Sequence, residues 1–164
     1  MKKFTILMFM SIFVMACNQD QEALVAFEKN SKTMDLLYKS YANENVDYSK
    51  FNEKVVFKGT LFGSKDSLYL DEIKEIHTEF FKNYDVEHMT EFNYLPGVNP
   101  ETGKIDGSVR MYYDMKVTRT ATDSTEEKSV IIPIYESFDF DEEGKALYVQ
   151  WYCDWTASIG SLEN

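Results

Sequence analysis

The sequence predicts an α+β fold in which N-terminal helices precede several long antiparallel strands. In 21–43 and again in 67–83, apolar residues recur at three- and four-residue intervals, the period of a helix buried along one side. From residue 86 onward apolar and polar residues alternate instead, the period of a strand covered on one face. The 164 residues suffice for one domain with a substantial core.

The chain begins with a predicted export signal. Lys2 and Lys3 precede an apolar run over 4–16, and about 13 residues are too few to span a bilayer but match a secretory signal. The following Val14-Met15-Ala16-Cys17 resembles a bacterial lipobox. We therefore expect a signal peptide over 1–16, a lipidated Cys17 with a polar tether over 17–22, and a folded domain over 23–164.

Lipidation of Cys17 implies a location in the bacterial cell envelope. Each buried methylene contributes about 0.8 kcal/mol, so two or more acyl chains on Cys17 give stable membrane anchoring. The next residue, Asn18, is not the aspartate associated with retention in the inner membrane. The sequence favours the outer membrane and leaves open whether the domain faces the periplasm or the cell surface.

Charge and cysteine content narrow the partners further. The formal net charge of −11 becomes −13 once Lys2 and Lys3 are cleaved off, which disfavours nucleic acid. If Cys17 carries lipid, Cys153 has no cysteine with which to form an intramolecular disulfide. Because Cys153 lies between Trp151 and Trp155 on an apolar face, we expect a buried, unreactive thiol.

Both predicted helices carry an apolar and aromatic stripe. In the second helix Ser67 is the expected N-cap, and His77 lies in the middle of the stripe. His77 is either a neutral core histidine bonded to a carbonyl or an acid or base that lines a pocket. The two stripes consist of Leu24, Phe27, Met34, Leu37, Tyr38 and Tyr41, and of Leu70, Ile73, Ile76, His77, Phe80, Phe81 and Tyr84.

Four extended segments follow the helices. The first covers 86–95, where we expect His88 at the surface, and Pro96-Gly97 then begins a loop of about a dozen residues. The second covers 109–117 and pairs antiparallel, through a polar loop at 121–127, with a third from Val130 to Phe140. The fourth is one long strand over 145–160.

Glu136 occupies the apolar face of the third of these strands. It shares that face with Val130, Ile132, Ile134, Phe138 and Phe140. Burying an ionised carboxylate there is costly, so Glu136 must be paired, protonated or near water. Alternatively, a bulge near Pro133 and Ser137 shields it.

Three segments carry a resemblance to a known family: the helix end Tyr38-Lys-Ser-Tyr41-Ala-Asn, the segment from Asp71 to Phe81, and the stretch from Asp141 to Asp154. Together they resemble the nuclear transport factor 2-like, or SnoaL-like, superfamily. The similarity covers about residues 23–160. It implies a cone-shaped, strongly curved antiparallel sheet wrapped around N-terminal helices, with a deep apolar cavity at the open end, and often a homodimer through the sheet.

This resemblance does not by itself decide the function. The same cone hosts isomerases, dehydratases, polyketide cyclases, epoxide hydrolases and members that only bind. In limonene epoxide hydrolases a catalytic carboxylate lies three residues before the position of Asp154, and here that residue is Trp151. Ketosteroid isomerases use a tyrosine and a protonated aspartate as donors, for which Tyr38 or Tyr41 and Glu136 are the available substitutes.

We expect a noncatalytic module that binds a small apolar ligand or a partner segment. The expected pocket residues are Tyr38, Tyr41, Tyr113 and Trp151. The alternative is a small isomerase, dehydratase or hydrolase that uses His77 or Glu136 as acid or base. A third possibility is a structural interaction protein whose outer sheet face, with Tyr112, Tyr148, Gln150 and Tyr152, forms a dimer. No metal-ligand spacing or phosphate-binding loop is present, so no cofactor is expected.

Overall fold

The computed structural model describes residues 2–61, 63–122 and 125–163, with side chains from residue 21 onward. The predicted signal peptide over 1–16 and the lipidation of Cys17 fall outside the residues whose side chains are described. Within the described part, no helix combines the length and the apolar character needed to cross a bilayer.

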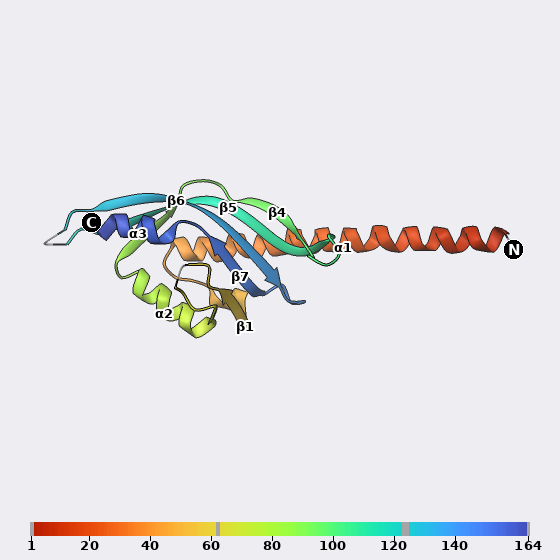
Figure 1. The fold of residues 1–164 in the computed structure, drawn as a ribbon, viewed down its shortest axis with the longest axis horizontal. Helices are drawn as coiled ribbons and strands as arrows, with labels where there is room; N and C mark the ends of the chain where they lie inside the picture. The colour runs from red at the N-terminus through yellow and green to blue at the C-terminus, as the bar shows by residue number, and fades with distance from the viewer. Residues whose placement is uncertain (1, 62, 123–124, 164) are drawn as a thin grey trace.

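In the described part of the chain, seven strands form one curved sheet and three helices pack against it (Figure 1). The helices are α1 (Lys2–Ala42), α2 (Leu70–Phe80) and α3 (Trp155–Glu163), with a short 3-10 turn η1 (Tyr48–Lys50). The strands are β1 (Phe51–Lys58), β2 (Ser67–Tyr69), β3 (Tyr84–His88), β4 (Asn93–Val98), β5 (Ile105–Arg119), β6 (Lys128–Phe140) and β7 (Ala146–Tyr152).

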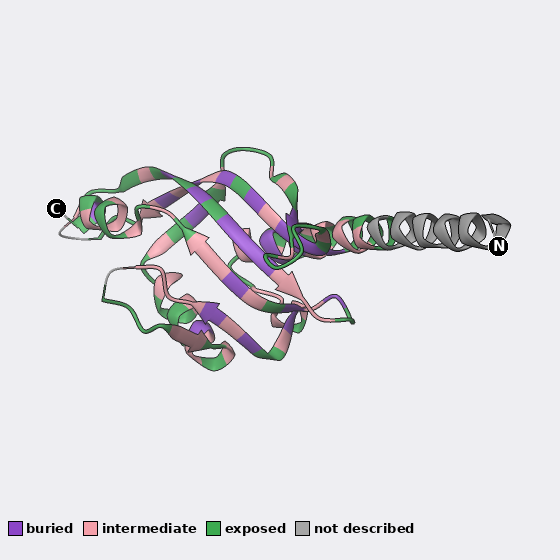
Figure 2. Cartoon of the chain, turned by 45° about the vertical axis from the view of Figure 1, so that its right-hand side comes forward, coloured by how far each residue is buried: buried purple, intermediate pink, exposed green. Residues whose placement is uncertain are grey.

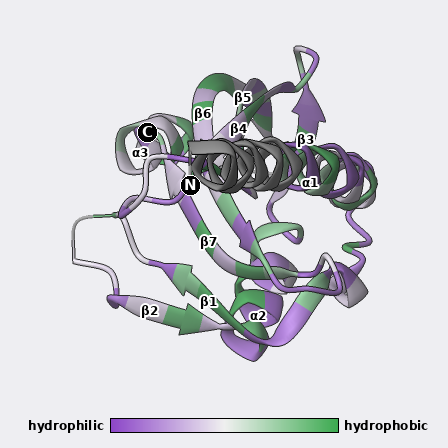
Figure 3. Cartoon of the chain, turned by 90° about the vertical axis from the view of Figure 1, so that its right-hand side faces the viewer, coloured by the Kyte–Doolittle hydropathy of each residue, from purple (hydrophilic) through white to green (hydrophobic). Residues whose placement is uncertain are grey.

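The sheet is mixed, whereas an entirely antiparallel one was expected. Its order is β2-β1-β7-β6-β5-β3, and β4 also pairs with β5. Strand β1 runs parallel to β7, and the other pairs are antiparallel. No hairpin connects β1 to β7, so the local sequence pattern carries no signal for their relative direction. Viewed along α1, the sheet curls from β3 and β4 round to β1 and β2 (Figure 3).

The hydrophobic core lies between the concave face of this sheet and α1. The predicted stripe of β5, Val109, Met111, Tyr113, Met115 and Val117, is buried throughout, and the same face of β6 buries Ile132, Ile134 and Phe138. Buried and exposed bands alternate along the strands in Figure 2. The period-two prediction for these two strands is therefore confirmed.

The predicted last strand ends earlier than expected and is followed by a helix. Strand β7 stops at Tyr152, and α3 begins at Trp155. Asp154 caps α3, because its Oδ1 accepts a hydrogen bond from the N–H of Ala157 at 3.3 Å and its carbonyl accepts one from Ser158 at 3.1 Å. A structural role for Asp154 follows. The sequence did not predict this cap, because Cys153 and Trp155 continue the alternation of apolar and polar residues that is typical of a strand.

A register shift between β6 and β7 changes which residues of β7 face the core. The pairing of β6 with β7 is irregular between Asp139 and Phe140, and Leu147 is exposed although it has the same strand parity as the buried Val149. In contrast, β5 and β6 pair without interruption from Val109–Phe138 to Arg119–Lys128. The expected bulge that would shield Glu136 is therefore absent from this pairing.

Helix α2 is shorter than predicted, and the first strand predicted after it is divided into two. Ser67 is in β2 and does not cap α2, which begins at Leu70, and the N–H of Tyr69 donates to Glu72 Oε2 at 3.0 Å. The predicted strand over 86–95 is two strands, β3 and β4, which pair with different parts of β5. Pro96 and Gly97 belong to β4 rather than to a loop, and an edge strand tolerates a proline because it need not donate on its free side.

The concave face lies close to α1 at Gly107. This residue has φ +81°, and a Cβ there would lie 2.9 Å from Ala26 Cβ. The buried side chain of Asn30 donates to the Gly107 carbonyl at 2.9 Å. These contacts fix α1 beneath the sheet and so position its C-terminal half, which carries Tyr38 and Tyr41.

Candidate functional site

A cavity of about 760 Å³ opens between α2, the C-terminal half of α1 and the concave face of the sheet. Its size is within the range of sites for small organic ligands. The wall is mainly apolar and aromatic, and includes Leu37, Val46, Phe51, Phe57, Leu68, Ile73, Phe80, Met115, Ile134, Phe138, Val149 and Trp155.

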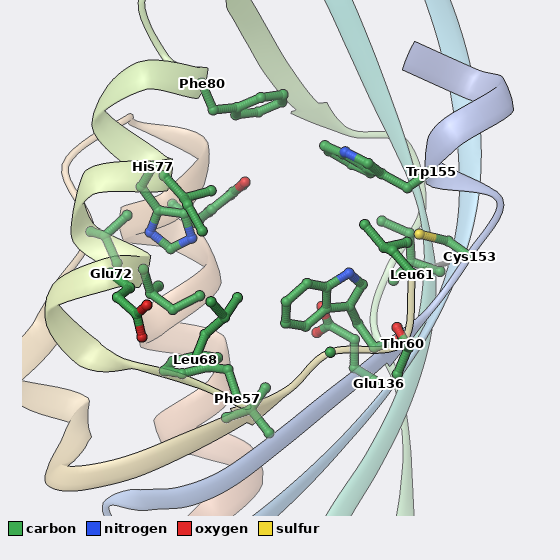
Figure 4. Close-up of a pocket in the computed structure, with 18 of the residues that line it drawn as sticks. Phe57, Thr60, Leu61, Leu68, Glu72, His77, Phe80, Glu136, Cys153 and Trp155 are labelled. Carbon is green, nitrogen blue, oxygen red and sulfur yellow. The ribbon is translucent and has the colours of Figure 1, made fainter. Parts of the chain in front are cut away.

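All six pocket or catalytic residues proposed from the sequence line this one cavity: Tyr38, Tyr41, His77, Tyr113, Glu136 and Trp151. They come from α1, α2, β5, β6 and β7. The curvature of the sheet brings them together, since the strands bend around the helices. Figure 4 shows His77 on the α2 wall and Glu136 and Cys153 on the sheet wall across the cavity.

Glu136 is a buried carboxyl group in the sheet wall. It lies on β6 between Met111 of β5 and Trp151 of β7 and is 9% exposed. Its Oε2 has no hydrogen-bond partner among the described residues. Burial raises the pKa of Glu136 to about 8 because an apolar environment disfavours the charged form. At neutral pH Glu136 is therefore mainly a neutral acid that can donate a hydrogen bond into the cavity.

The sulfur of Cys153 lies in the same wall. Burial, and then the neighbouring Glu136, raise the pKa of the Cys153 thiol to about 11. A thiol in this state is a poor nucleophile at neutral pH. The carbonyl of Trp151 accepts a hydrogen bond from Thr60 Oγ1 at 2.5 Å, which ties the segment after β1 to the end of β7 and completes this side of the wall.

His77 projects from α2 and is held by Tyr48. Its Nδ1 lies 3.0 Å from Tyr48 Oη, so the expected backbone carbonyl partner is replaced by a phenol. The imidazole also packs edge-on against Tyr41, with 5.2 Å between ring centroids. Burial lowers the pKa of His77 to about 4. His77 is therefore a neutral imidazole at physiological pH, oriented by a hydrogen bond.

His88 was expected at the surface, but its ring lies inside. It packs against Tyr38, Phe92 and Tyr113, with centroid separations of 5.7, 4.9 and 5.4 Å. Both ring nitrogens are buried and have no hydrogen-bond partner among the described residues. Burial lowers the pKa of His88. The sequence held the signal, because His88 has the same strand parity as the buried Val86.

Carboxylates on α2 complete the cavity, and the sequence reasoning had missed them. Glu72, Glu75 and Glu79 all line it, and the one basic lining residue in the described part of the chain is Lys65. Lys65 Nζ lies 2.5 Å from Glu72 Oε1, so its charge is already paired. The i, i+3 and i+7 spacing of these glutamates on one helix is a sequence signal for an acidic face. Among the residues that the structure describes, no three histidine, cysteine, aspartate or glutamate side chains are grouped so that they could hold a metal ion.

Comparison with known proteins identifies the fold. No protein-family model matches the sequence, and curated proteins give no significant sequence match. Among solved structures, a candidate polyketide cyclase from Xanthomonas campestris superposes with a TM-score of 0.63 at 14% identity, over 82% of this chain and 98% of the other. A nuclear transport factor 2-like protein from Burkholderia xenovorans gives 0.60 at 6% identity, over 84% and 97%.

An epoxide hydrolase from M. tuberculosis, similar to limonene epoxide hydrolase, gives a TM-score of 0.56 at 11% identity, over 83% of this chain and 86% of the other. The chain therefore has the nuclear transport factor 2-like fold, with an N-terminal helix and a curved mixed sheet. At these identities the likeness is one of fold, and function has to be argued from the cavity itself.

Proposed function

We propose that this protein is a lipid-anchored binding module of the bacterial cell envelope whose cavity holds a small apolar ligand without transforming it. The observation that carries the proposal is the cavity of about 760 Å³ with its aromatic and aliphatic wall. His77 and Glu136, which face each other across this cavity, are both neutral at physiological pH. Such a wall favours apolar molecules because their burial removes hydrocarbon surface from water.

Ligand binding should be visible in the intrinsic fluorescence of the protein. The chain has two tryptophans, Trp151 and Trp155, and both line the cavity. A neutral apolar probe such as 3-phenyl-1-propanol should shift or quench their emission saturably and raise the melting temperature.

A variant that fills the cavity tests whether the probe binds there. Cys153→Phe places a ring in the wall and should weaken binding at least about tenfold, which corresponds to about 1.4 kcal/mol. Thr156→Phe adds the same ring at an exposed position of α3 outside the lining and is the matched control. Equal binding by both variants, or no saturable response in the wild type, would count against the proposal.

The membrane anchor is tested separately at Cys17. Because the acyl chains would be attached through the Cys17 sulfur, Cys17→Ser should move the protein from the membrane pellet to the soluble fraction. Cys153→Ser, which removes the other thiol, should stay in the pellet. Undiminished membrane association of Cys17→Ser would contradict lipidation.

The expected homodimer through the sheet also belongs to the proposal. Tyr112, Tyr135 and Tyr152 form a row of exposed side chains across β5, β6 and β7, which is the surface proposed for this contact.

The second candidate function is proton-transfer catalysis, favoured by one specific observation. His77 and Glu136 line the same cavity, so a substrate between them could meet an acid and a base with Tyr41 or Tyr113 nearby. The two functions differ in the fate of the ligand. Binding alone predicts that the molecule copurified with the protein is recovered unchanged after incubation, whereas an enzyme would release an isomer, a dehydrated product or a hydrolysed product detectable by mass spectrometry.

A further inference from the structure

The cavity contains a carboxyl group whose hydrogen bonding the protein leaves incomplete. Glu136 is 9% exposed, and its buried Oε2 has no partner among the described residues. Buried polar atoms without a partner are rare because each lost hydrogen bond is costly. A cationic group carried by the ligand is a natural partner for this carboxyl group, since Glu136 lines the cavity.

The walls around this carboxyl group suit a cation. Aromatic rings line the cavity on both sides, among them Phe80 on α2, Trp151 on β7 and Trp155 on α3. The face of an aromatic ring attracts an ammonium group, and indole does so most strongly. An apolar body carrying one positive charge would therefore find favourable contacts for both of its parts.

The negative charges at the cavity also favour a cationic ligand. Glu72, Glu75 and Glu79 line it from α2. Glu72 is paired with Lys65 and Glu79 with Lys82, so Glu75 is the α2 carboxylate in this lining that has no ion pair among the described residues. The whole chain carries a formal net charge of −11. Such a field raises the local concentration of cations and disfavours anions.

We propose that the ligand is an amphiphilic amine, whose apolar body fills the aromatic cavity and whose ammonium group pairs with the carboxylate of Glu136. This inference rests on the proposed function, because it names the ligand class for the same cavity. It differs from that function in requiring a positive charge on the ligand, so the two can fail independently.

Binding of an amine has to be balanced by release of a proton. The pKa of Glu136 is about 8 in the free protein, so at lower pH the acid must lose its proton to the solvent when it pairs with an ammonium. The other titratable groups that line the cavity around it do not compensate. His77 on α2 has a pKa of about 4 and is neutral, and burial raises the pKa values of Tyr41, Tyr113 and Cys153, which also stay neutral. The α2 carboxylates Glu72, Glu75 and Glu79 and the paired Lys65 carry the remaining charges.

The experiment compares three probes with one apolar body and different charges. They are 3-phenylpropylamine, 3-phenyl-1-propanol and 3-phenylpropanoate, each titrated calorimetrically into the full chain in lipid nanodiscs, with empty nanodiscs as the blank. The amine should bind at least about tenfold more tightly than the alcohol at about pH 8, and the propanoate should bind most weakly. Between about pH 6 and about pH 7 the affinity for the amine should rise up to about tenfold, then level off above about pH 8, while that for the alcohol stays flat.

Two variants test the role of the carboxyl group. In Glu136→Gln the preference for the amine over the alcohol, measured at high salt so that the longer-range charges of α2 are screened, should fall to about one. Its pH dependence should disappear, because a neutral amide cannot form the ion pair. Glu101→Gln, at an exposed position outside the lining, is the matched control and should keep the preference and its pH dependence. Should Glu136→Gln not fold, the pH profile of the wild type still decides the question.

Each outcome has a distinct meaning. Equal affinities for amine and alcohol at every pH, or a preference for the propanoate, would overturn the amine inference and leave the apolar binding module in place. Absence of binding by all three probes would remove the proposed function and this inference together.

Discussion

Ile132→Ala should destabilise the protein by about 2 to 5 kcal/mol, the range for truncating a fully buried aliphatic side chain. Ile132 is 0% exposed and lies on the core face of β6, opposite Met115 of β5. Truncation removes hydrocarbon burial and leaves a space that the uninterrupted pairing of β5 and β6 prevents from closing. Urea denaturation followed by far-UV circular dichroism measures the change in the free energy of unfolding.

The neighbouring residue is a matched control for this effect. Ile131 has the same side chain on the same strand but points outward and is 54% exposed. Ile131→Ala should change the free energy of unfolding by less than about 1 kcal/mol. Similar losses in the two variants would show that the β6 face assignment, and with it the inward position of Glu136, is wrong.

Glu136→Gln should remove a large part of the pH dependence of stability. The folded-state pKa of Glu136 is about 8, raised from 4.5 by burial. Between these values the folded protein holds a proton that the unfolded chain releases, so stability falls as pH rises from 4.5 to about 8 and then levels off. The full shift corresponds to an upper bound of about 4 to 5 kcal/mol, and solvent in the cavity reduces the expected loss to about 2 to 4 kcal/mol.

The difference between variant and wild type isolates this one group. His77, whose pKa is lowered to about 4, contributes the opposite slope in both proteins, because its folded form binds fewer protons between about 4 and 6.5. Glu136→Gln should match the wild type at low pH and exceed it by about 2 to 4 kcal/mol at about pH 9. Glu101→Gln, an exposed glutamate in the turn after β4, should track the wild type throughout. Parallel curves for wild type and Glu136→Gln would contradict the buried, protonated acid.

The fold class and the core strands were predictable because their signals are local. In β5 every second residue from Val109 to Val117 is buried, as alternation required. The same alternation predicted that Glu136 lies on the inner face of β6, and this prediction is confirmed. The alternative, a bulge near Pro133 and Ser137 that shields the carboxyl group, is wrong because β5 and β6 pair without interruption there. Helix α1 ends at Ala42, close to the predicted end.

The errors occurred where local patterns compete. Cys153 and Trp155 continued the alternation of β7, yet the capping hydrogen bond of Asp154 starts a helix there. Ser67 was predicted to be a helix cap, but it lies in β2, where it pairs with Lys58 of the antiparallel strand β1. His88 was assigned to the surface on residue type, although its strand parity pointed inward, and tertiary packing against Tyr38 and Phe92 holds it there.

The sequence alone therefore determined the α+β class and the inner faces of β5 and β6, because the period of apolar residues is a local property. Residue type, which is also local, supplied the set of candidate site residues: Tyr38, Tyr41, His77, Tyr113, Glu136 and Trp151. Only the tertiary structure decided that these six share one cavity, that β1 runs parallel to β7, and that the glutamates of α2 line the same space. Those facts depend on how a curved sheet closes over the helices, and contacts between residues far apart in the chain leave no periodic mark on the sequence.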